Sequence, residues 1–281
     1  MTGTTRFNLL ALAASAACLV ASGVNADQVV LTTVADNTLI EDPSGAYSCG
    51  AAQYFFAGRV GANGGSTLRR GAIRFNLSSI PAGSTITSVS LKLYCSAAGL
   101  NSSYTVSLKK MNASWGEGPS TAFGGGGAPS ADGDATWLHR FYPNTLWSTA
   151  GGQFNSTASA SRSVAGQGYY TWTSTAQLVA DVQGWLDNPV TNFGWLVQGN
   201  EVTLQSAKRF DSREAAAATR PQLTVVYTRP NPSDLNNDGK VNAVDLATLL
   251  GAWGGSGAGD INGSGVVDGV DLATLLSAWT G

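Results

Sequence analysis

The sequence predicts a mainly β protein: a jelly-roll-like β-sandwich with one packed helix, followed by a small all-α module of two loop–helix motifs. Three observations lead to this prediction. Residues 27–228 consist of short runs in which apolar and polar residues alternate, separated by Gly, Asn, Ser and Pro. One stretch within them has helical periodicity instead. The end of the chain contains the same twenty-residue pattern twice.

The strand prediction rests on period-two alternation, which places successive side chains on opposite faces of a strand. Ile73 and Phe75, for example, alternate with Ala72 and Arg74. Many short strands with turn residues between them are typical of a sandwich. The predicted strands span residues 29–34, 71–77, 88–95, 105–111, 169–173, 194–198 and 222–227. The stretches 124–127 and 151–165 are rich in small and polar residues and are expected to form loops.

One helix is predicted inside the sandwich region. Ser174 or Thr175 provides an N-cap, and Asn188-Pro189 ends the helix. Its apolar residues recur at helical spacing, so this face is expected to pack against the sheets. They are Leu178, Val179, Val182, Trp185 and Leu186. Trp172, Trp185 and Trp195 all lie in strand or helix patterns and are assigned to the core.

The N-terminus predicts secretion. Arg6 precedes an apolar stretch at 9–20, and the small residues before Asp27 fit a cleavage site, so residues 1–26 are expected to be a signal peptide. Its removal leaves 15 basic and 18 acidic residues, with no basic patch for nucleic acid. No other segment is long and apolar enough to span a membrane. We therefore expect an extracellular or cell-surface protein.

Two cysteines remain after the signal peptide is removed. Cys95 alternates with Val89, Leu91 and Leu93, so its side chain is expected to point into the core. In an oxidising compartment, a disulfide between Cys49 and Cys95 is predicted, worth about 4 kcal/mol on the chain-entropy model. The alternative is two buried free thiols that behave as small hydrophobic side chains.

The repeat has the spacing of a calcium-binding loop. Residues 234–253 and 260–279 are identical at 13 of 20 positions. A twelve-residue calcium loop uses oxygen ligands at positions 1, 3, 5, 7, 9 and 12, with Gly at position 6. In the first copy these ligands are Asp234, Asn236, Asp238, the carbonyl of Lys240, Asn242 and Asp245. In the second they are Asp260, Asn262, Ser264, the carbonyl of Val266, Asp268 and Asp271. Two calcium ions are therefore predicted.

Two features separate the repeat from an ordinary EF-hand. The last ligand is Asp in both copies, and Pro230 and Pro232 leave no room for an incoming helix. With the duplication, these features resemble the type I dockerin module of bacterial secreted proteins, over residues 233–281. The resemblance implies calcium-dependent binding to a cohesin-type module on a scaffold or cell surface. It also implies partner selection by loop positions 10 and 11, here Ala243-Val244 and Gly269-Val270.

A stripe of apolar residues follows each loop. Leu246, Leu249, Leu250 and Trp253 recur in the second copy as Leu272, Leu275, Leu276 and Trp279. Both stripes are expected to pack the two helices together, since so small a module has little other core. The alternative is that the repeat is a calcium-stapled C-terminal cap without a partner.

Several segments of the larger region resemble the DNRLRE family of bacterial β-sandwich domains, which includes carbohydrate-binding modules. The segments are 36–41, where Thr38 and Ile40 stand in place of Arg, and 70–83, 115–118 and 208–214. The resemblance covers roughly residues 28–228 and implies a sandwich that binds polysaccharide.

The residues themselves offer one candidate sugar site. Trp137, His139, Tyr142 and Trp147 lie close together in a stretch rich in Gly and Asn, and aromatic rings stack on sugar faces. The alternative is that these rings fill the core.

A catalytic site is not evident. Hydrolysis of a glycoside requires two carboxylates beside a cleft. The candidates Glu117, Asp132, Asp134, Asp211 and Glu214 stand in no diagnostic motif. The acids at 211–214 are expected to form cross-strand ion pairs with Lys208, Arg209 and Arg213.

These observations predict a secreted modular protein. The predicted parts are a signal peptide at 1–26, a sandwich at 27–228, a linker at 229–232 and a dockerin-like module at 233–281. The sandwich is expected to bind polysaccharide or a surface component, while the module docks the protein to its partner. The alternatives are a polysaccharide hydrolase or lyase of a dockerin-bearing system, and a structural surface protein.

Overall fold

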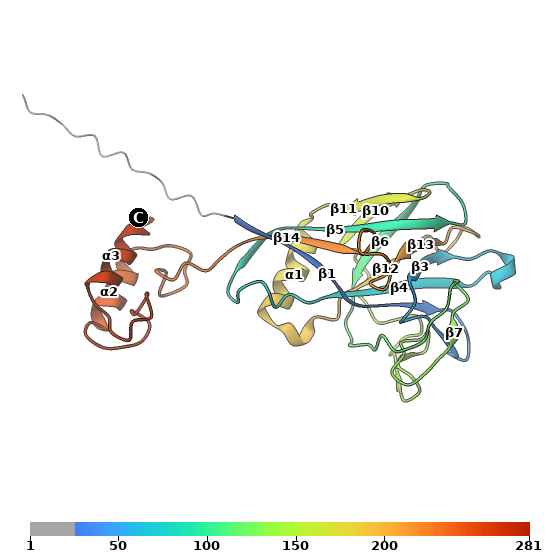
Figure 1. Ribbon diagram of the computed structural model, residues 1–281, viewed down its shortest axis with the longest axis horizontal. Helices are drawn as coiled ribbons and strands as arrows, with labels where there is room; N and C mark the ends of the chain where they lie inside the picture. The colour runs from blue at the N-terminus through green and yellow to red at the C-terminus, as the bar shows by residue number, and fades with distance from the viewer. Residues whose placement is uncertain (1–25) are drawn as a thin grey trace, which may run out of the picture.

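A computed structural model describes residues 26–281, so all of the predicted signal peptide except its last residue, Ala26, lies outside the described residues. The fold is mainly β, with a sandwich-like arrangement of strands and few helices (Figure 1). Over the described range, no helix is long and apolar enough to cross a membrane.

The sandwich consists of two sheets that share strands at their edges. In the first sheet, one edge of β5 pairs with β14 and then β13, and its other edge pairs with β11. The strands of this sheet are β1 Ala26–Ile40, β3 Tyr54–Arg59, β5 Thr85–Ala98, β11 Gly168–Trp172, β13 Lys208–Asp211 and β14 Gln222–Thr228. The second sheet runs from β1 through β4 Leu68–Phe75, β12 Trp195–Gln198 and β6 Tyr104–Lys110 to β10 Ala160–Val164.

Strand β1 belongs to both sheets. Its first half pairs with β14 and its second half, after an irregularity between Thr33 and Ala35, pairs with β4. A bulge bends a strand and increases its twist, which allows one strand to turn the corner of a sandwich. The first half of β1 alternates in exposure, whereas residues 35–40 are all buried. The corner therefore carries Asp36 and Asn37 into the interior.

The main core lies between the sheets and is closed by α1, Ala176–Asp187. Thr175 caps this helix by accepting a hydrogen bond from the backbone N–H of Leu178, 3.0 Å away. Its predicted apolar face is buried against β5, and Trp172, Trp185 and Trp195 are core residues as predicted. The indole N–H of Trp195 donates to the buried carboxylate of Asp181, which lies on the helix. The helix and its orientation are therefore confirmed.

All seven predicted strands occur, but several others were missed. Strand β10 lies within 151–165, which was predicted to be a loop; only its end residues, Ala160 and Val164, are buried, so its sequence lacks the alternating apolar signal. The short β3 and β13 were also missed. The remaining short elements are β2 Tyr47–Ser48, β7 Ala128–Pro129, β8 His139–Phe141, β9 Thr145–Leu146, and the 3₁₀ turns η1 Ala62–Gly64 and η2 Pro189–Thr191.

The structure does not form the predicted disulfide. Cys49 and Cys95 are both buried as free thiols. Cys95 points into the main core as expected, but Cys49 lies in a separate apolar cluster with Ile40 and Ala52. Burial raises the pKa of the Cys49 thiol to about 11, so the thiol stays protonated and packs as a small hydrophobic group.

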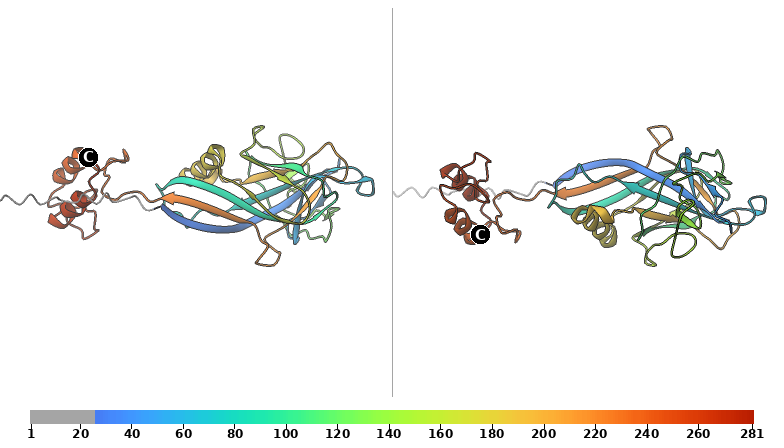
Figure 2. Two further views of the ribbon diagram at one scale, coloured as in Figure 1. Left: turned by 90° about the horizontal axis from the view of Figure 1, so that it is seen from above. Right: turned by 90° about the horizontal axis from the view of Figure 1, so that it is seen from below.

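The C-terminal segment has its own apolar cluster, formed by Val241, Leu249, Val267 and Leu275. Its helices are α2, Ala243–Gly251, and α3, Gly269–Ser277 (Figure 2). The two copies are joined by backbone hydrogen bonds: Gly254 N–H donates to Val267 and Thr280 N–H donates to Val241. The repeat in the sequence is thus a repeat in space.

Candidate functional site

The two predicted calcium loops adopt the same conformation. In the first, Asp234 accepts backbone hydrogen bonds from Asp238 and Gly239, at 3.1 and 2.8 Å. In the second, Asp260 accepts the corresponding bonds from Ser264 and Gly265, at 2.9 and 2.7 Å. The position-6 glycines have φ of +86° and +93°, the left-handed conformation that a sharp turn requires and that favours glycine.

The last predicted ligand of each loop is a buried aspartate at the start of a helix. Asp245 accepts backbone hydrogen bonds from Leu235, at 2.8 Å, and from Asn242, also at 2.8 Å, and completes a capping box with Asn242. Asp271 occupies the equivalent position and bonds to the backbone N–H of Asp268. These backbone hydrogen bonds lower the pKa of both carboxyl groups, so both stay ionised.

Most of the remaining predicted ligands are exposed, although Asn242 is half-buried and caps α2. They offer only oxygen atoms, the donor type that calcium prefers. The side chains of Asn236, Asp238 and Ser264 and the residues Lys240 and Val266 are exposed. The fit to calcium therefore rests on donor chemistry, on the two glycine turns and on the identical folding of both copies. The helix-capping role of the aspartates was not anticipated from the ligand pattern.

The predicted apolar stripe divides into a buried and an exposed half. Leu249 and Leu275 are fully buried, whereas Trp253 and Trp279 are 50% and 40% exposed. Leu250 and Leu276 are exposed as well, so the prediction that the whole stripe packs between the helices is wrong. Each helix has only nine residues, and a single short partner covers only one side of it.

The four residues implied to select the partner lie at the N-terminal turns of α2 and α3. Ala243, Val244, Gly269 and Val270 are all exposed. Val244 and Val270 are among the most exposed large apolar side chains of this segment, at 55% and 58%. Both helices therefore present apolar side chains to solvent at corresponding positions.

The predicted aromatic site is not a set of four exposed rings. Trp147 is buried, and its indole N–H donates to the carbonyl of Thr136, 2.9 Å away, so Trp147 is a core residue. His139 and Tyr142 stack edge to face, with ring centroids 5.1 Å apart. Trp137 is half-buried beneath the guanidinium of Arg70, 4.8 Å from its ring centroid. Contacts with other residues of the chain therefore already cover much of the surface of these rings.

The charged residues at 208–214 are arranged differently from the predicted cross-strand pairs. Lys208 is fully buried, and its ammonium group donates to the carbonyls of Leu100, Ser102 and Ala165. Burial lowers the pKa of Lys208. Arg209 stacks on the ring of Tyr54 instead, at 4.0 Å. Neither cation forms an ion pair with an acid of residues 26–281.

The other predicted carboxylates do not form a catalytic pair beside a cleft. Asp134 is buried and accepts hydrogen bonds from Ser120, while Asp132 is exposed on a loop. Glu117 and Glu214 are bridged by Arg213, at 2.6 and 2.9 Å. One guanidinium therefore engages both carboxylates.

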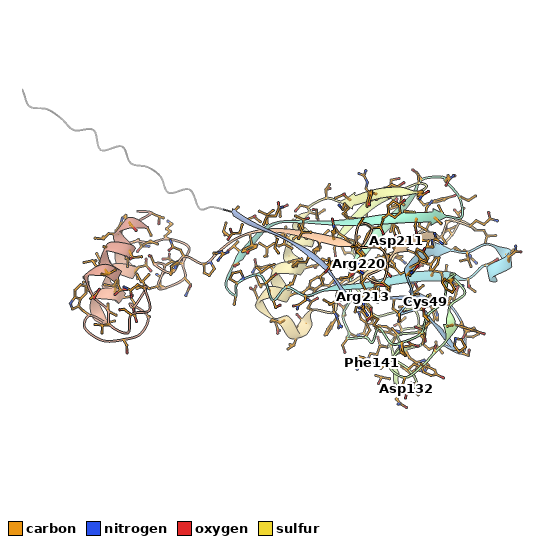
Figure 3. All side chains as sticks on the ribbon, viewed as in Figure 1. Cys49, Asp132, Phe141, Asp211, Arg213 and Arg220 are labelled. Atoms are coloured by element: carbon orange, nitrogen blue, oxygen red, sulfur yellow. The ribbon has the colours of Figure 1, made fainter. Side chains whose placement is uncertain are left out.

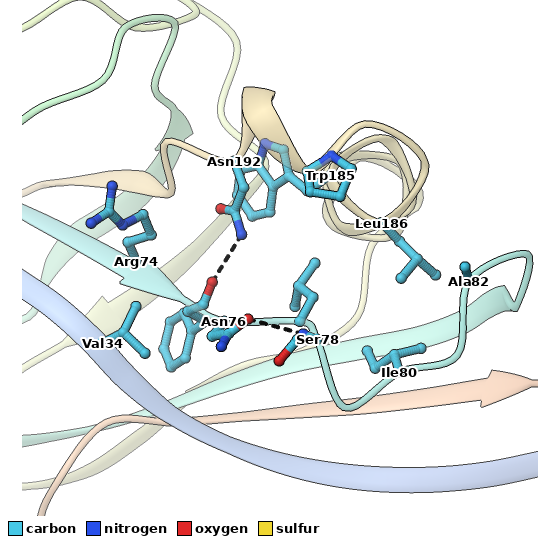
Figure 4. A pocket seen from close by; sticks show the side chains of 12 residues that line it. Val34, Arg74, Asn76, Ser78, Ile80, Ala82, Trp185, Leu186 and Asn192 are labelled. Carbon is cyan, nitrogen blue, oxygen red and sulfur yellow. Dashed lines mark hydrogen bonds between the residues drawn. The ribbon is translucent and has the colours of Figure 1, made fainter.

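A cavity of about 530 Å³ opens between α1 and the turn that follows β4 (Figure 4). Its walls are largely apolar and include Ile80, Leu186 and the edge of Trp185. Arg74, Asn76 and Asn192 add polar groups. The carboxamide of Asn192 donates to the carbonyl of Phe75, while its Oδ1 is buried with no partner among residues 26–281. Nothing in the sequence marked this cavity, because its residues come from separate segments.

Comparisons with known proteins leave the family open. No protein-family model matches the chain, and no curated protein is similar to it in sequence.

Proposed function

We propose that this is a secreted, modular bacterial protein whose dockerin-like tail, loaded with two calcium ions, attaches a jelly-roll-like sandwich to a cohesin-type partner. The observation that carries this proposal is the duplicated, exposed apolar surface of α2 and α3. Contiguous apolar patches on a protein surface mark sites of interaction, and we infer that these exposed side chains form such patches.

The exposed side chains form corresponding sets on the two helices. Val244 and Leu250 lie on α2, and Trp253 follows its C-terminal end. They match Val270 and Leu276 on α3 and Trp279 just after it, and all six are at least 40% exposed. Tryptophan is enriched among the residues that dominate binding energy at protein interfaces. A calcium-stapled cap without a partner would gain nothing from leaving both indoles in water.

The two loops are the proposed calcium sites. The carboxylate ligands are Asp234, Asp238 and Asp245 in the first loop and Asp260, Asp268 and Asp271 in the second. Bound calcium would supply a fixed double positive charge that draws the carboxylates of each loop together and neutralises them. The backbone hydrogen bonds to Asp245 and Asp271 hold these acids ionised at the helix N-termini. Ion binding would thereby couple loop order to the orientation of α2 and α3.

The sandwich is proposed to bind polysaccharide or a surface component through the cavity in Figure 4. Its volume of about 530 Å³ suits one or two sugar rings. Apolar walls accommodate the faces of sugar rings, and Arg74, Asn76 and Asn192 offer hydrogen bonds to hydroxyl groups. The cavity is better suited to bind a sugar than the predicted aromatic group, because Trp147 of that group is buried in the core.

A capture experiment tests the docking proposal. The whole secreted chain is immobilised and exposed to a purified cohesin-type module, in calcium and then in excess chelator. We expect retention only in calcium, and loss of retention when Trp253 and Trp279 are both replaced by Ala. Retention in chelator, or full retention by the double variant, would contradict the proposal. A glycan array with the same chain, and with Asn192→Ala as the comparison, tests the sandwich ligand.

A further inference from the structure

Three distant segments of the sandwich bring carboxyl groups together at one point. Asp36 lies on β1, Glu117 in the loop after β6, and Glu214 in the turn after β13. One oxygen atom from each lies within 4.8 Å of the others. Among residues 26–281 this is the one group of three acidic, histidine or cysteine side chains so close together, and it lies outside the calcium loops.

The three acids share a single cationic neighbour. The guanidinium of Arg213 donates to both oxygens of Glu117, at 2.6 Å each, and lies 2.9 Å from Glu214. Arg213 reaches Asp36 only through its backbone N–H, 2.8 Å from Oδ2. With all three acids ionised, one guanidinium leaves a net charge of −2, the charge that one divalent cation neutralises. Figure 3 labels Arg213 on the sandwich part of the chain.

Asp36 supplies the second, independent observation. Its side chain is 1% exposed, and its Oδ1 is buried with no hydrogen-bond donor in reach among residues 26–281. Burial raises the pKa of Asp36 well above its usual range, and the neighbouring Glu214 and Glu117 add to this. A buried carboxylate oxygen without a partner is costly unless it binds a cation or a proton.

The donor atoms determine which cation fits. All three side chains offer oxygen, with no imidazole or thiolate in the group, which favours a hard cation such as calcium over zinc or copper. Glu117 and Glu214 are 17% and 22% exposed, so the group reaches the surface and water can complete the coordination. Arg213 is 39% exposed and has room to turn outward.

We propose that Asp36, Glu117 and Glu214 form a divalent-cation site of calcium type in the sandwich, separate from the two loops of the tail. The bound ion links β1 to the loop after β6 and to the turn after β13. Without the ion, hydrogen bonds to these carboxylates already join the three segments: the backbone N–H of Asp36 donates to Glu117, and that of Arg213 donates to Asp36. The site therefore acts as a staple at the corner where β1 passes between the sheets.

The test uses the whole secreted chain with calcium chloride as the probe. Asp245→Ala and Asp271→Ala together remove one proposed calcium ligand from each tail loop and should abolish calcium binding there. The outcome therefore does not depend on the proposed docking function. Native mass spectrometry is expected to show one calcium ion on this double variant. Its melting temperature should rise by about 5 °C when calcium is in large excess over the dissociation constant.

Two further variants locate the ion. Adding Asp36→Asn or Glu214→Gln to the double variant should abolish the remaining calcium, whereas Asp132→Asn, an exposed acid on a loop, should not. Circular dichroism shows whether each variant is folded; if Asp36→Asn unfolds the sandwich, Glu214→Gln decides. The proposal is overturned if the folded double variant binds no calcium at millimolar concentration. It is equally overturned if Glu214→Gln retains the ion at unchanged affinity.

Discussion

The packing of the tail leads to a quantitative prediction for Leu249→Ala. Leu249 is fully buried in the apolar cluster of the tail. The other buried members of this cluster are Val241, Val267 and Leu275. Removing a buried leucine side chain costs about 2–5 kcal/mol, which is comparable to the whole stability that so small a core provides. Leu250 lies next in sequence but is half-exposed, so Leu250→Ala should cost less than about 1 kcal/mol.

Calcium should offset the cost of this cavity. Each ion bound only by the folded loops adds about 2.7 kcal/mol at a concentration 100 times its dissociation constant, and two ions add about 5 kcal/mol. Leu249→Ala should therefore keep α2 and α3 folded in calcium and lose them in chelator. Leu250→Ala should keep them in both conditions.

Hydrogen exchange followed by mass spectrometry provides the assay, because it reports on α2 and α3 peptides within the intact chain. The expected result is fast exchange of both helices in Leu249→Ala only when calcium is removed. Equal protection of Leu249→Ala in calcium and in chelator would refute the coupling of the ions to folding. Equal loss in Leu250→Ala would refute the division of the stripe into buried and exposed halves.

Three other outcomes are expected. Trp253→Ala with Trp279→Ala should weaken capture by the cohesin-type module at least tenfold while calcium binding by calorimetry is unchanged; a parallel loss of calcium would contradict a role in the interface. Burial raises the pKa of Glu201, but hydrogen bonds from Arg70 outweigh this and lower it overall. Glu201→Gln should therefore cost about 1–3 kcal/mol at neutral pH. That cost should vanish as the pH falls through the pKa of folded Glu201, and a pH-independent difference in urea unfolding would contradict the ion pair. Cys49 and Cys95 should react with a thiol reagent only after denaturation, and a reductant should leave the melting temperature unchanged. If the denatured protein has no reactive thiol at these two positions, the predicted disulfide is present after all.

Local patterns predicted the regular elements well. Period-two alternation identified the long strands, and Thr175 with the following apolar spacing located α1 to within a residue. Strand β10 escaped prediction because only Ala160 and Val164 face the interior. The repeat predicted two copies of one loop–helix unit, since both its ligand spacing and its helix pattern are encoded within twenty consecutive residues.

Features that depend on the meeting of distant segments could not be predicted in the same way. Asp36, Glu117 and Arg213 are separated by 81 and 96 residues along the chain, and no local pattern indicates that they meet. Trp147 belongs to a polar stretch, yet its indole is buried against Thr136. The exposure of Trp253 follows from how few neighbours two nine-residue helices provide, which helical periodicity alone does not reveal.

The central claim is that the duplicated loops bind calcium and make the tail an attachment device. Equilibrium dialysis of the chain from Asp27 onward tests it most directly, by comparing calcium bound to the parent and to the variant with Asp245→Ala and Asp271→Ala. The account predicts that the variant binds two fewer ions per chain, whatever the sandwich itself holds. Equal binding by the two proteins at millimolar calcium would contradict it.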